Sequence, residues 1–281
     1  MIELDSVIGA AQDLDPLPQT VARLASLVSH ADVDFAEIVE TVRLDPALTG
    51  RLLKAANSAA AGGRTEVTTV RLAVSRLGTG AVLSVAMSFS VRGRLSSAVP
   101  AYDLGEGDLW RHSVLAALAA EEIRKLARNE IPPDSFTAAL LHDVGKLVLG
   151  RYLDSDSLEA LRRAREQGSL DPVRAEEELL MVNHGEVGGL IAQKWGLPLR
   201  ITQAITYHHH PEQHPDPTCA TVAVANAIAK CIPADGETLD LEQVVPGEKV
   251  GREVIGLSEE DFCSIVEKIG TRFDELRQKY S

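Results

Sequence analysis

Two adjacent residues, His142 and Asp143, have the types and the setting that best suit chemistry in this sequence. They lie with Lys146 in the otherwise apolar stretch 140–149, whose apolar spacing and lack of proline predict a buried helix. An unpaired charge in such a helix is costly, so Asp143 requires a cation or strong hydrogen-bond donors. A divalent metal would meet this need, with a nitrogen from His142 and an oxygen from Asp143. The alternative is a salt bridge from Asp143 to Lys146, with His142 only hydrogen-bonded.

The other histidines strengthen the metal hypothesis. Seven of the eight lie between residues 112 and 214, and those among the candidate ligands lie on four predicted helices. Two of them follow Ile205 by three and four residues, which predicts that both project from the buried side of one helix. The candidate metal ligands are His112, His142, Asp143, His184, His208 and His209. Six ligands suffice for one or two metals, and imidazole with carboxylate suits iron, manganese, nickel or zinc.

The elements that would position these side chains are almost all predicted to be helices, which makes the fold class all-α. Aromatic residues are 4% of the chain, and no long stretch alternates polar and apolar residues. Helix starts are expected after Asp34, at Asp45-Pro46 and after Thr68 or Thr69. The segment 183–186 resembles a capping box. The charged stretch 154–178 is expected to form one or two solvated surface helices.

Punctuation by proline and glycine divides the chain into three predicted regions. Residues 1–98 form an N-terminal helical lobe, and the boundary lies in the proline- and glycine-containing stretch that begins at Val99. Residues 99–234 form a second helical lobe with all six candidate ligands, and the first lobe is expected to pack on it. Residues 235–281 form a C-terminal helical extension, with a final helix predicted from about Ser258 to Tyr280.

Composition and charge bear on location and partners. The formal net charge is −13, which disfavours general binding to nucleic acid or to an anionic membrane. Three cysteines form no CxxC pair, which is typical of a reducing compartment. The longest apolar run, residues 80–91, is too short to span a bilayer, and the N-terminus lacks a secretory leader. A cytoplasmic location is therefore expected.

Several phrases together resemble the HD superfamily of metal-dependent phosphohydrolases. They are LLHDVGK at 140–146, NHGEVGGLIAQKWGLP at 183–198 and YHHHPE at 207–212. Residues 13–232 resemble, more narrowly, an HDOD (HD-related output domain) protein. That resemblance includes LPQTVARLASLV, LDPALTGRLLKAANSA and VTTVRLAVSRLG in the first lobe. It implies an all-helical regulatory module of bacterial signalling, with the six candidate ligands at the superfamily's metal positions.

The resemblance also implies roles for neighbouring residues. Lys146 would contact a phosphate, although a solvated lysine at a helix end is the favoured alternative. Asp108 could stand where some two-metal members carry a glutamate. The superfamily's last aspartate corresponds here to Asn226, which offers a neutral oxygen in place of a charged ligand. The Gly-Tyr-Pro signature of cyclic di-GMP phosphodiesterases does not occur where it would be expected.

These departures favour a regulatory reading of the chain over an enzymatic one. The expected function is a signalling protein with a degenerate or weakly active HD site, which acts mainly through contacts with other signalling proteins. The alternative is a metal-dependent phosphohydrolase of a nucleotide or cyclic dinucleotide, with Asp143 and Lys146 as its catalytic residues. A nucleotide ligand is compatible with both.

Overall fold

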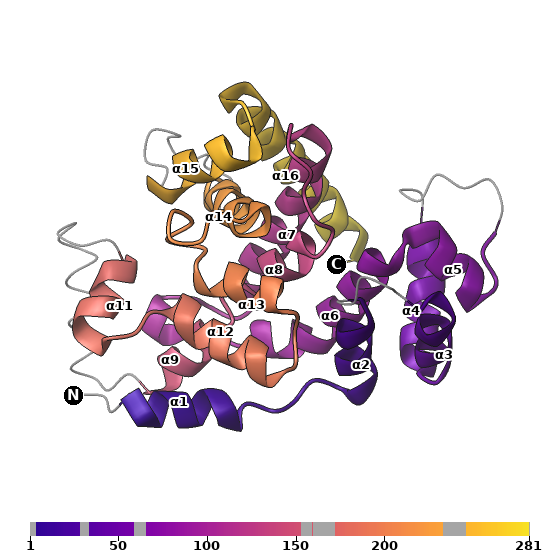
Figure 1. Ribbon diagram of the computed structural model, residues 1–281, viewed down its shortest axis with the longest axis horizontal. Coiled ribbons are helices and arrows are strands. Elements are labelled where there is room, and N and C mark those ends of the chain that lie inside the picture. The colour runs from indigo at the N-terminus through magenta and orange to yellow at the C-terminus, as the bar shows by residue number, and fades with distance from the viewer. Residues whose placement is uncertain are drawn as a thin grey trace. The chain divides into compact units, whose positions relative to one another are not determined.

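The computed structural model describes residues 4–28, 34–58, 66–152, 159, 172–232 and 246–280. Within these ranges the secondary structure is helical, with one isolated bridge between Val99 and Leu104 and no strand (Figure 1). The predicted all-α class is therefore confirmed. The chain forms two compact units. One comprises residues 1–14, 94–193 and 199–281, and the other comprises residues 15–93 and 194–198.

The smaller unit is built from short helices with capped starts. Its elements are α2 (Gln19–Val28), α3 (Phe35–Arg43), α4 (Pro46–Ala56), α5 (Val70–Leu77) and most of α6 (Thr79–Leu95). The side chains of Asp34, Asp45 and Thr69 accept hydrogen bonds from backbone N–H groups in the first turns of α3, α4 and α5. These three predicted starts are confirmed.

The larger unit contains every candidate ligand. Two elements precede the candidate ligands in the chain: α1 (Leu4–Asp13) and the short 3-10 helix η2 (Pro100–Tyr102). The site region is formed by α7 (Asp108–Leu126), α8 (Ser135–Leu141), α9 (Lys146–Tyr152), α11 (Pro172–Leu180), α12 (His184–Lys194), α13 (Leu199–Thr206) and α14 (Pro217–Lys230). The remaining helices are α15 (Pro246–Ile255) and α16 (Glu259–Tyr280), and α16 matches the predicted final helix within a residue.

Helix α14 is the centre of this unit. It packs against α7, α8, α13 and α15 (Figure 1). Its side chains from Thr218 to Ala229 are all buried, and most are small. Small residues let neighbouring backbones approach: a Cβ on Gly251 of α15 would lie 2.9 Å from the carbonyl oxygen of Ala220. Asn226 is therefore a polar side chain on a helix that is enclosed on all sides.

The stretch 140–149 is not the continuous buried helix that its apolar spacing predicts. Helix α8 ends at Leu141, residues 142–145 form a turn, and α9 starts at Lys146. A Cβ on Gly145 would lie 1.9 Å from the carbonyl oxygen of His184. Only glycine fits this contact, so the turn that carries Asp143 lies directly against the first residue of α12.

The charged stretch 154–178 also differs from expectation. Residues 153–158 and 160–171 lie outside the described residues. In α11, which follows them, Val173, Ala175 and Glu176 are buried. One side of α11 thus belongs to the core of the unit, and the prediction of a purely solvated helix is wrong there.

The helices were also compared with the requirements of a membrane span. In the described part of the chain, no helix by itself combines the length and hydropathy needed to cross a bilayer. Helices α5 and α6 reach those values only as a pair, and the pair is bent by 106°.

Candidate metal centre

The six candidate ligands reach one place from different elements of the larger unit. His112 lies in the second turn of α7, His142 and Asp143 form the turn between α8 and α9, and His184 begins α12. The paired histidines 208 and 209 lie in a turn just past α13, which ends at Thr206, and not on the helix itself as predicted. The expected convergence is confirmed, since the ring centroids of His142 and His208 are 4.9 Å apart.

Asp143 lies between two groups of histidines. Its Oδ2 atom is 3.6 Å from His112 Nε2 and 3.5 Å from His142 Nε2. Its Oδ1 atom is 3.1 Å from His184 Nε2 and 3.9 Å from His208 Nε2. The carboxylate itself is 2% exposed. One buried aspartate therefore presents a different oxygen to each group.

We name the two groups the His112 half and the His184 half. The His112 half consists of His112, His142 and Asp143, and its candidate ligand atoms all lie within 4.8 Å of one another. The His184 half consists of His184, His208 and His209, with the same spacing, and it shares Asp143. Each half offers three ligand atoms that are close enough to bind one ion together, and two such halves side by side are the arrangement of a two-metal site.

Two histidines are held in the tautomer that a metal requires. His142 Nδ1 is 2.7 Å from the carbonyl oxygen of Ala139, and His208 Nδ1 is 2.7 Å from that of Ile205. A carbonyl can only accept, so each Nδ1 donates and each Nε2 keeps its lone pair for the centre. The Nε2 atom of His208 is buried and has no hydrogen-bond partner among the described residues. Buried polar atoms are seldom left unpaired, and a metal ligand atom is one explanation.

Glu176 of α11 supports the His184 half and was missed by the sequence reasoning. Its carboxylate lies 2.8 Å and 2.9 Å from His184 Nδ1 and accepts a 2.7 Å hydrogen bond from the backbone N–H of His184. A carboxylate behind a histidine orients the ring and makes it a more basic ligand. The spacing of Val173, Glu176 and Leu180 places them on one helical face, a signal that could have identified Glu176.

The start of α12 is fixed by the predicted capping box. The N–H of Asn183 donates to Glu186 Oε2 at 2.9 Å, and the N–H of Glu186 donates to Asn183 Oδ1 at 3.0 Å. This reciprocal pair confirms the prediction. It also sets the position of His184, which is the first residue of the helix.

Asn226 faces the His112 half, as the superfamily correspondence predicts. Its Oδ1 atom is 3.1 Å from His112 Nε2, and the residue is 5% exposed. The side chain offers a neutral amide oxygen at a position where a carboxylate would add a negative charge. The His112 half therefore has one anionic group, Asp143, which it shares.

Lys146 pairs with Asp143. Its Nζ atom is 2.7 Å from Asp143 Oδ2 and 5.6 Å from the centroid of the Tyr102 ring. The salt bridge that the sequence offered as the alternative to a metal is present. The preference for a solvated lysine is wrong, since the Lys146 side chain is 17% exposed. The ammonium group contacts the oxygen of Asp143 that faces the His112 half, so it would compete with a metal for that oxygen.

Other acidic and basic candidates lie apart from the two halves. Asp108 Oδ2 accepts a hydrogen bond from the N–H of Gly105 at 2.8 Å and belongs to neither half. His210 contacts Glu177 and Glu212 at 3.3 Å and 3.2 Å. The structure thus separates the paired histidines 208 and 209 from the third histidine of that run.

Burial is the main cause of the lowered pKa values of four histidines in the site. Burial lowers the pKa of His112 to about 3, although Asp143 opposes the change. It also lowers the pKa of His142, His208 and His209. Those imidazoles are neutral at neutral pH, the form that binds a metal.

Two residues of the site differ from that pattern. Burial alone would lower the pKa of His184, but Glu176 and Asp143 raise it. Burial alone would raise the pKa of Asp143, but His142, Lys146 and His184 hold it well below its usual range. Asp143 is thus a stable carboxylate, and His184 keeps a proton to higher pH than the other four histidines of the site do.

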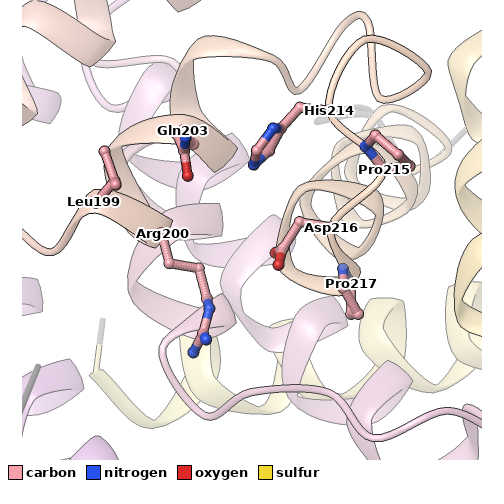
Figure 2. Close-up of a pocket in the computed structure, with 7 residues that line it drawn as sticks. All are labelled: Leu199, Arg200, Gln203, His214, Pro215, Asp216 and Pro217. Atoms are coloured by element: carbon pink, nitrogen blue, oxygen red, sulfur yellow. The ribbon is translucent and has the colours of Figure 1, made fainter.

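An open cleft of about 600 Å³ lies beside the turn that follows the paired histidines (Figure 2). The residues that line it are Leu199, Arg200, Gln203, His214, Pro215, Asp216 and Pro217. None of them belongs to either half. The ring of His214 stacks on that of Tyr207, with centroids 5.5 Å apart.

A helical unit with histidines on four elements around one His-Asp turn defines the class of HD-type proteins. The family comparison agrees and is narrower: residues 14–211 match the HDOD domain, so this chain belongs to the HDOD domain family. A relative from Treponema pallidum (strain Nichols), an uncharacterized protein, is 27% identical over 237 residues. Those residues are 83% of this chain and 45% of that protein, so the chain spans less than half of the relative's length.

Solved structures show the same fold. An HDOD domain protein with unknown function from Geobacter sulfurreducens has a TM-score of 0.68 at 24% identity, over 98% of this chain and 97% of that one. A protein from Shewanella amazonensis SB2B, provisionally named a phosphohydrolase, has a TM-score of 0.63 at 24% identity, over 94% and 98%. At these identities the likeness establishes the fold alone.

Proposed function

We propose that this protein is a bacterial signalling protein whose HD-type site binds divalent metal and which acts mainly through contacts with other proteins. The observation that carries the metal assignment is the position of Asp143, with one oxygen toward each group of histidines. The unpaired buried Nε2 of His208 supports it. Iron, manganese, nickel and zinc all suit a set of imidazole and carboxylate ligands.

Each candidate histidine would bind the ion of one half, and Asp143 would bind the ions of both. His112, His142 and Asp143 would hold an ion in the His112 half, and His184, His208, His209 and Asp143 would hold one in the His184 half. A metal bound there would act as a Lewis acid toward a phosphate oxygen. Ala139 and Ile205 fix the rings of His142 and His208 through their carbonyl oxygens. Glu176 fixes His184 and keeps negative charge beside the site.

The balance of charges at this site supports loose metal binding and slow turnover. Two divalent ions would bring four positive charges to a site with one carboxylate in contact, Asp143, and a second, Glu176, behind His184. Asn226 contributes none. Because neutral ligands offset an ion's charge poorly in a buried site, the His112 half is expected to bind its ion loosely. A loosely held metal suits a sensing or regulatory role better than rapid turnover.

A metal-dependent phosphohydrolase is the second candidate, and a specific observation favours it. The side chains of His112 and Lys146 are 20% and 17% exposed, while His142 and Asp143 are almost fully buried. The small exposed part of the site thus lies on the side of an ammonium group that could contact a phosphate. A nucleotide or cyclic dinucleotide is the substrate class that this reading implies.

Metal analysis combined with a hydrolysis screen tests the proposal. Protein purified without added metal is expected to contain bound divalent metal, and the His142→Ala variant is expected to contain less. Hydrolysis of nucleotides and of cyclic di-GMP should stay at background in both. Steady turnover near the usual enzyme range of about 1 per second, lost in His142→Ala, would establish the phosphohydrolase instead. A protein that binds neither metal nor nucleotide would contradict both candidates.

A further inference from the structure

Helices α4, α5 and α6 carry positive charge that the histidine site does not use. Each of the three helices contains two basic residues, and none contains an aspartate or glutamate. The basic residues are Arg51, Lys54, Arg71, Arg76, Arg92 and Arg94. The whole chain has a net charge of −13. Three successive helices with cations and no carboxylate, in an acidic protein, indicate a surface with a binding role.

Four of the side chains on these helices form one exposed surface. Arg51 and Lys54 are one turn apart on α4, and Phe89 and Arg92 are one turn apart on α6. All four are exposed, Phe89 at 43%. The guanidinium carbon of Arg51 is 3.9 Å from the centroid of the Phe89 ring, which brings the two pairs together. We name Arg51, Lys54, Phe89 and Arg92 the basic face.

Arg51 is arranged to receive a carboxylate. Its guanidinium plane lies against the Phe89 ring, which reduces its freedom before any partner arrives. Within the described residues, Arg51 makes no hydrogen bond or ion pair. Its N–H groups therefore keep the planar fork that binds a carboxylate through two parallel hydrogen bonds. Phe89, which is 43% exposed, adds an apolar contact next to that fork.

We propose that the basic face docks an acidic, partly apolar segment of a partner protein. Nucleic acid fits less well, because phosphate-directed binding typically uses about 6–10 cations, more than the basic face provides, and the net charge of −13 repels a polyanion. An anionic membrane also fits less well, because insertion needs several large apolar side chains and the basic face offers only Phe89, which Arg51 covers. This inference deepens the proposed regulatory function by naming the chemistry of a partner.

Fluorescence anisotropy with a defined probe tests the docking surface in the 281-residue chain. The probe is a fluorescein-labelled peptide of glutamate and leucine in amphipathic helical order. Saturable binding is expected, and Arg51→Glu should weaken it at least about tenfold, since like charges then face each other. Arg51→Lys should cause a smaller loss, because it keeps the charge and removes the fork. Phe89→Leu should also weaken binding, because it removes the ring that positions Arg51.

Matched controls separate the basic face from net charge. Lys249 of α15 is exposed in the other unit, so Lys249→Glu makes the same charge change away from the basic face. It should change the affinity less than about twofold. A peptide with glutamine in place of glutamate should not bind. Equal losses in Lys249→Glu and Arg51→Glu, or no binding of the acidic peptide, would overturn the proposal.

Two further probes distinguish the competing partners. Tighter binding to single-stranded DNA, or to vesicles of phosphatidylcholine and phosphatidylserine, would overturn the choice of a protein segment. The His142→Ala variant should bind the acidic peptide as the parent does. A failure of peptide binding and a failure of metal binding can therefore be told apart, since each has its own readout and variant.

Discussion

The two halves of the histidine site share Asp143 but differ in what surrounds them. The His184 half has three imidazoles, and Glu176 lies behind His184. The His112 half has two imidazoles, faces the neutral amide of Asn226 and has the Lys146 ammonium group on its side of Asp143. The His184 half thus gains negative charge from its neighbour Glu176, while the His112 half gains none and meets a competing cation, Lys146.

This difference shows how a metal site can lose affinity for its ion while it keeps its ligands. The His112 half keeps all three of its candidate ligands, so the presence of the ligands alone would not mark it as a weak site. The charges of the neighbouring side chains predict different metal affinities for the two halves, because a carboxylate that orients a ligand often changes metal affinity 10- to 100-fold. We expect the His184 half to bind the tighter ion and the His112 half to respond more to changes in its surroundings.

The largest effect is expected from Asp143→Asn, because Asp143 serves both halves. In the presence of a chelator the variant should lose about 3 kcal/mol of unfolding free energy, since Lys146 and His184 lose the carboxylate that they face. Stabilisation by added Mn²⁺ should disappear. Urea denaturation measures both effects. The control is Asp108→Asn, which keeps an acceptor for the N–H of Gly105 and should change stability by less than about 0.5 kcal/mol. Similar losses in both variants would argue against a central role for Asp143.

A large effect is also expected from Gly145→Ala, which tests how the halves are held together. The new methyl group would lie 1.9 Å from the carbonyl oxygen of His184, so α12 must move away from the Asp143 turn. We expect a loss of about 3 kcal/mol in stability and weaker metal binding in the His184 half. Gly50→Ala in α4 is the matched control, because no atom lies within 4 Å of its Cβ position. It should be neutral or stabilising by up to about 1 kcal/mol. A tolerated Gly145→Ala would refute the close contact.

Glu176→Gln should weaken the His184 half alone. Glutamine can still accept a hydrogen bond from His184 Nδ1, so the ring stays in place while the charge is lost. Metal affinity of that half is expected to fall about 10- to 100-fold, as measured by competition with a fluorescent chelator. Glu177→Gln is the control, because Glu177 contacts Asn183 and His210 and not His184. If the two variants lose affinity equally, a general loss of negative charge explains the effect better than the direct contact of Glu176 with His184 does.

Asn226→Asp should have the smallest effect and the opposite sign. A carboxylate 3 Å from His112 adds an anionic ligand to the His112 half, so affinity should rise roughly tenfold. Without metal the same change brings a second buried carboxylate near Asp143 and should lower stability. The variant should therefore gain more in melting temperature from added Mn²⁺ than the parent does. Equal gains at the same metal concentration would show that residue 226 does not contribute to binding.

Local chemistry made much of the fold and the site predictable. The N-caps Asp34 and Asp45 and the capping box of Asn183 and Glu186 are local signals, and each is confirmed. The convergence of the histidines followed from their residue types and from the likeness of the surrounding phrases to the HD pattern. The facing position of Asn226 followed from the same likeness.

Long-range packing was not predictable in the same way. Nothing near Gly145 in the sequence indicates that His184, far along the chain, approaches to within contact, so the break in 140–149 was missed. Glu176 lies in a run of charged residues that is typical of a solvated helix, and its burial depends on the partner that it finds in His184.

Titration of metal-depleted protein with Mn²⁺ by calorimetry is the most direct test of the two-half site. The parent is expected to show two classes of binding, the tighter from the His184 half. His209→Ala should remove the tighter class and His142→Ala the weaker one, while both variants keep Asp143 for the half that remains. Saturable binding that neither substitution changes, or no saturable binding in the parent, would contradict the assignment of these histidines as a metal centre.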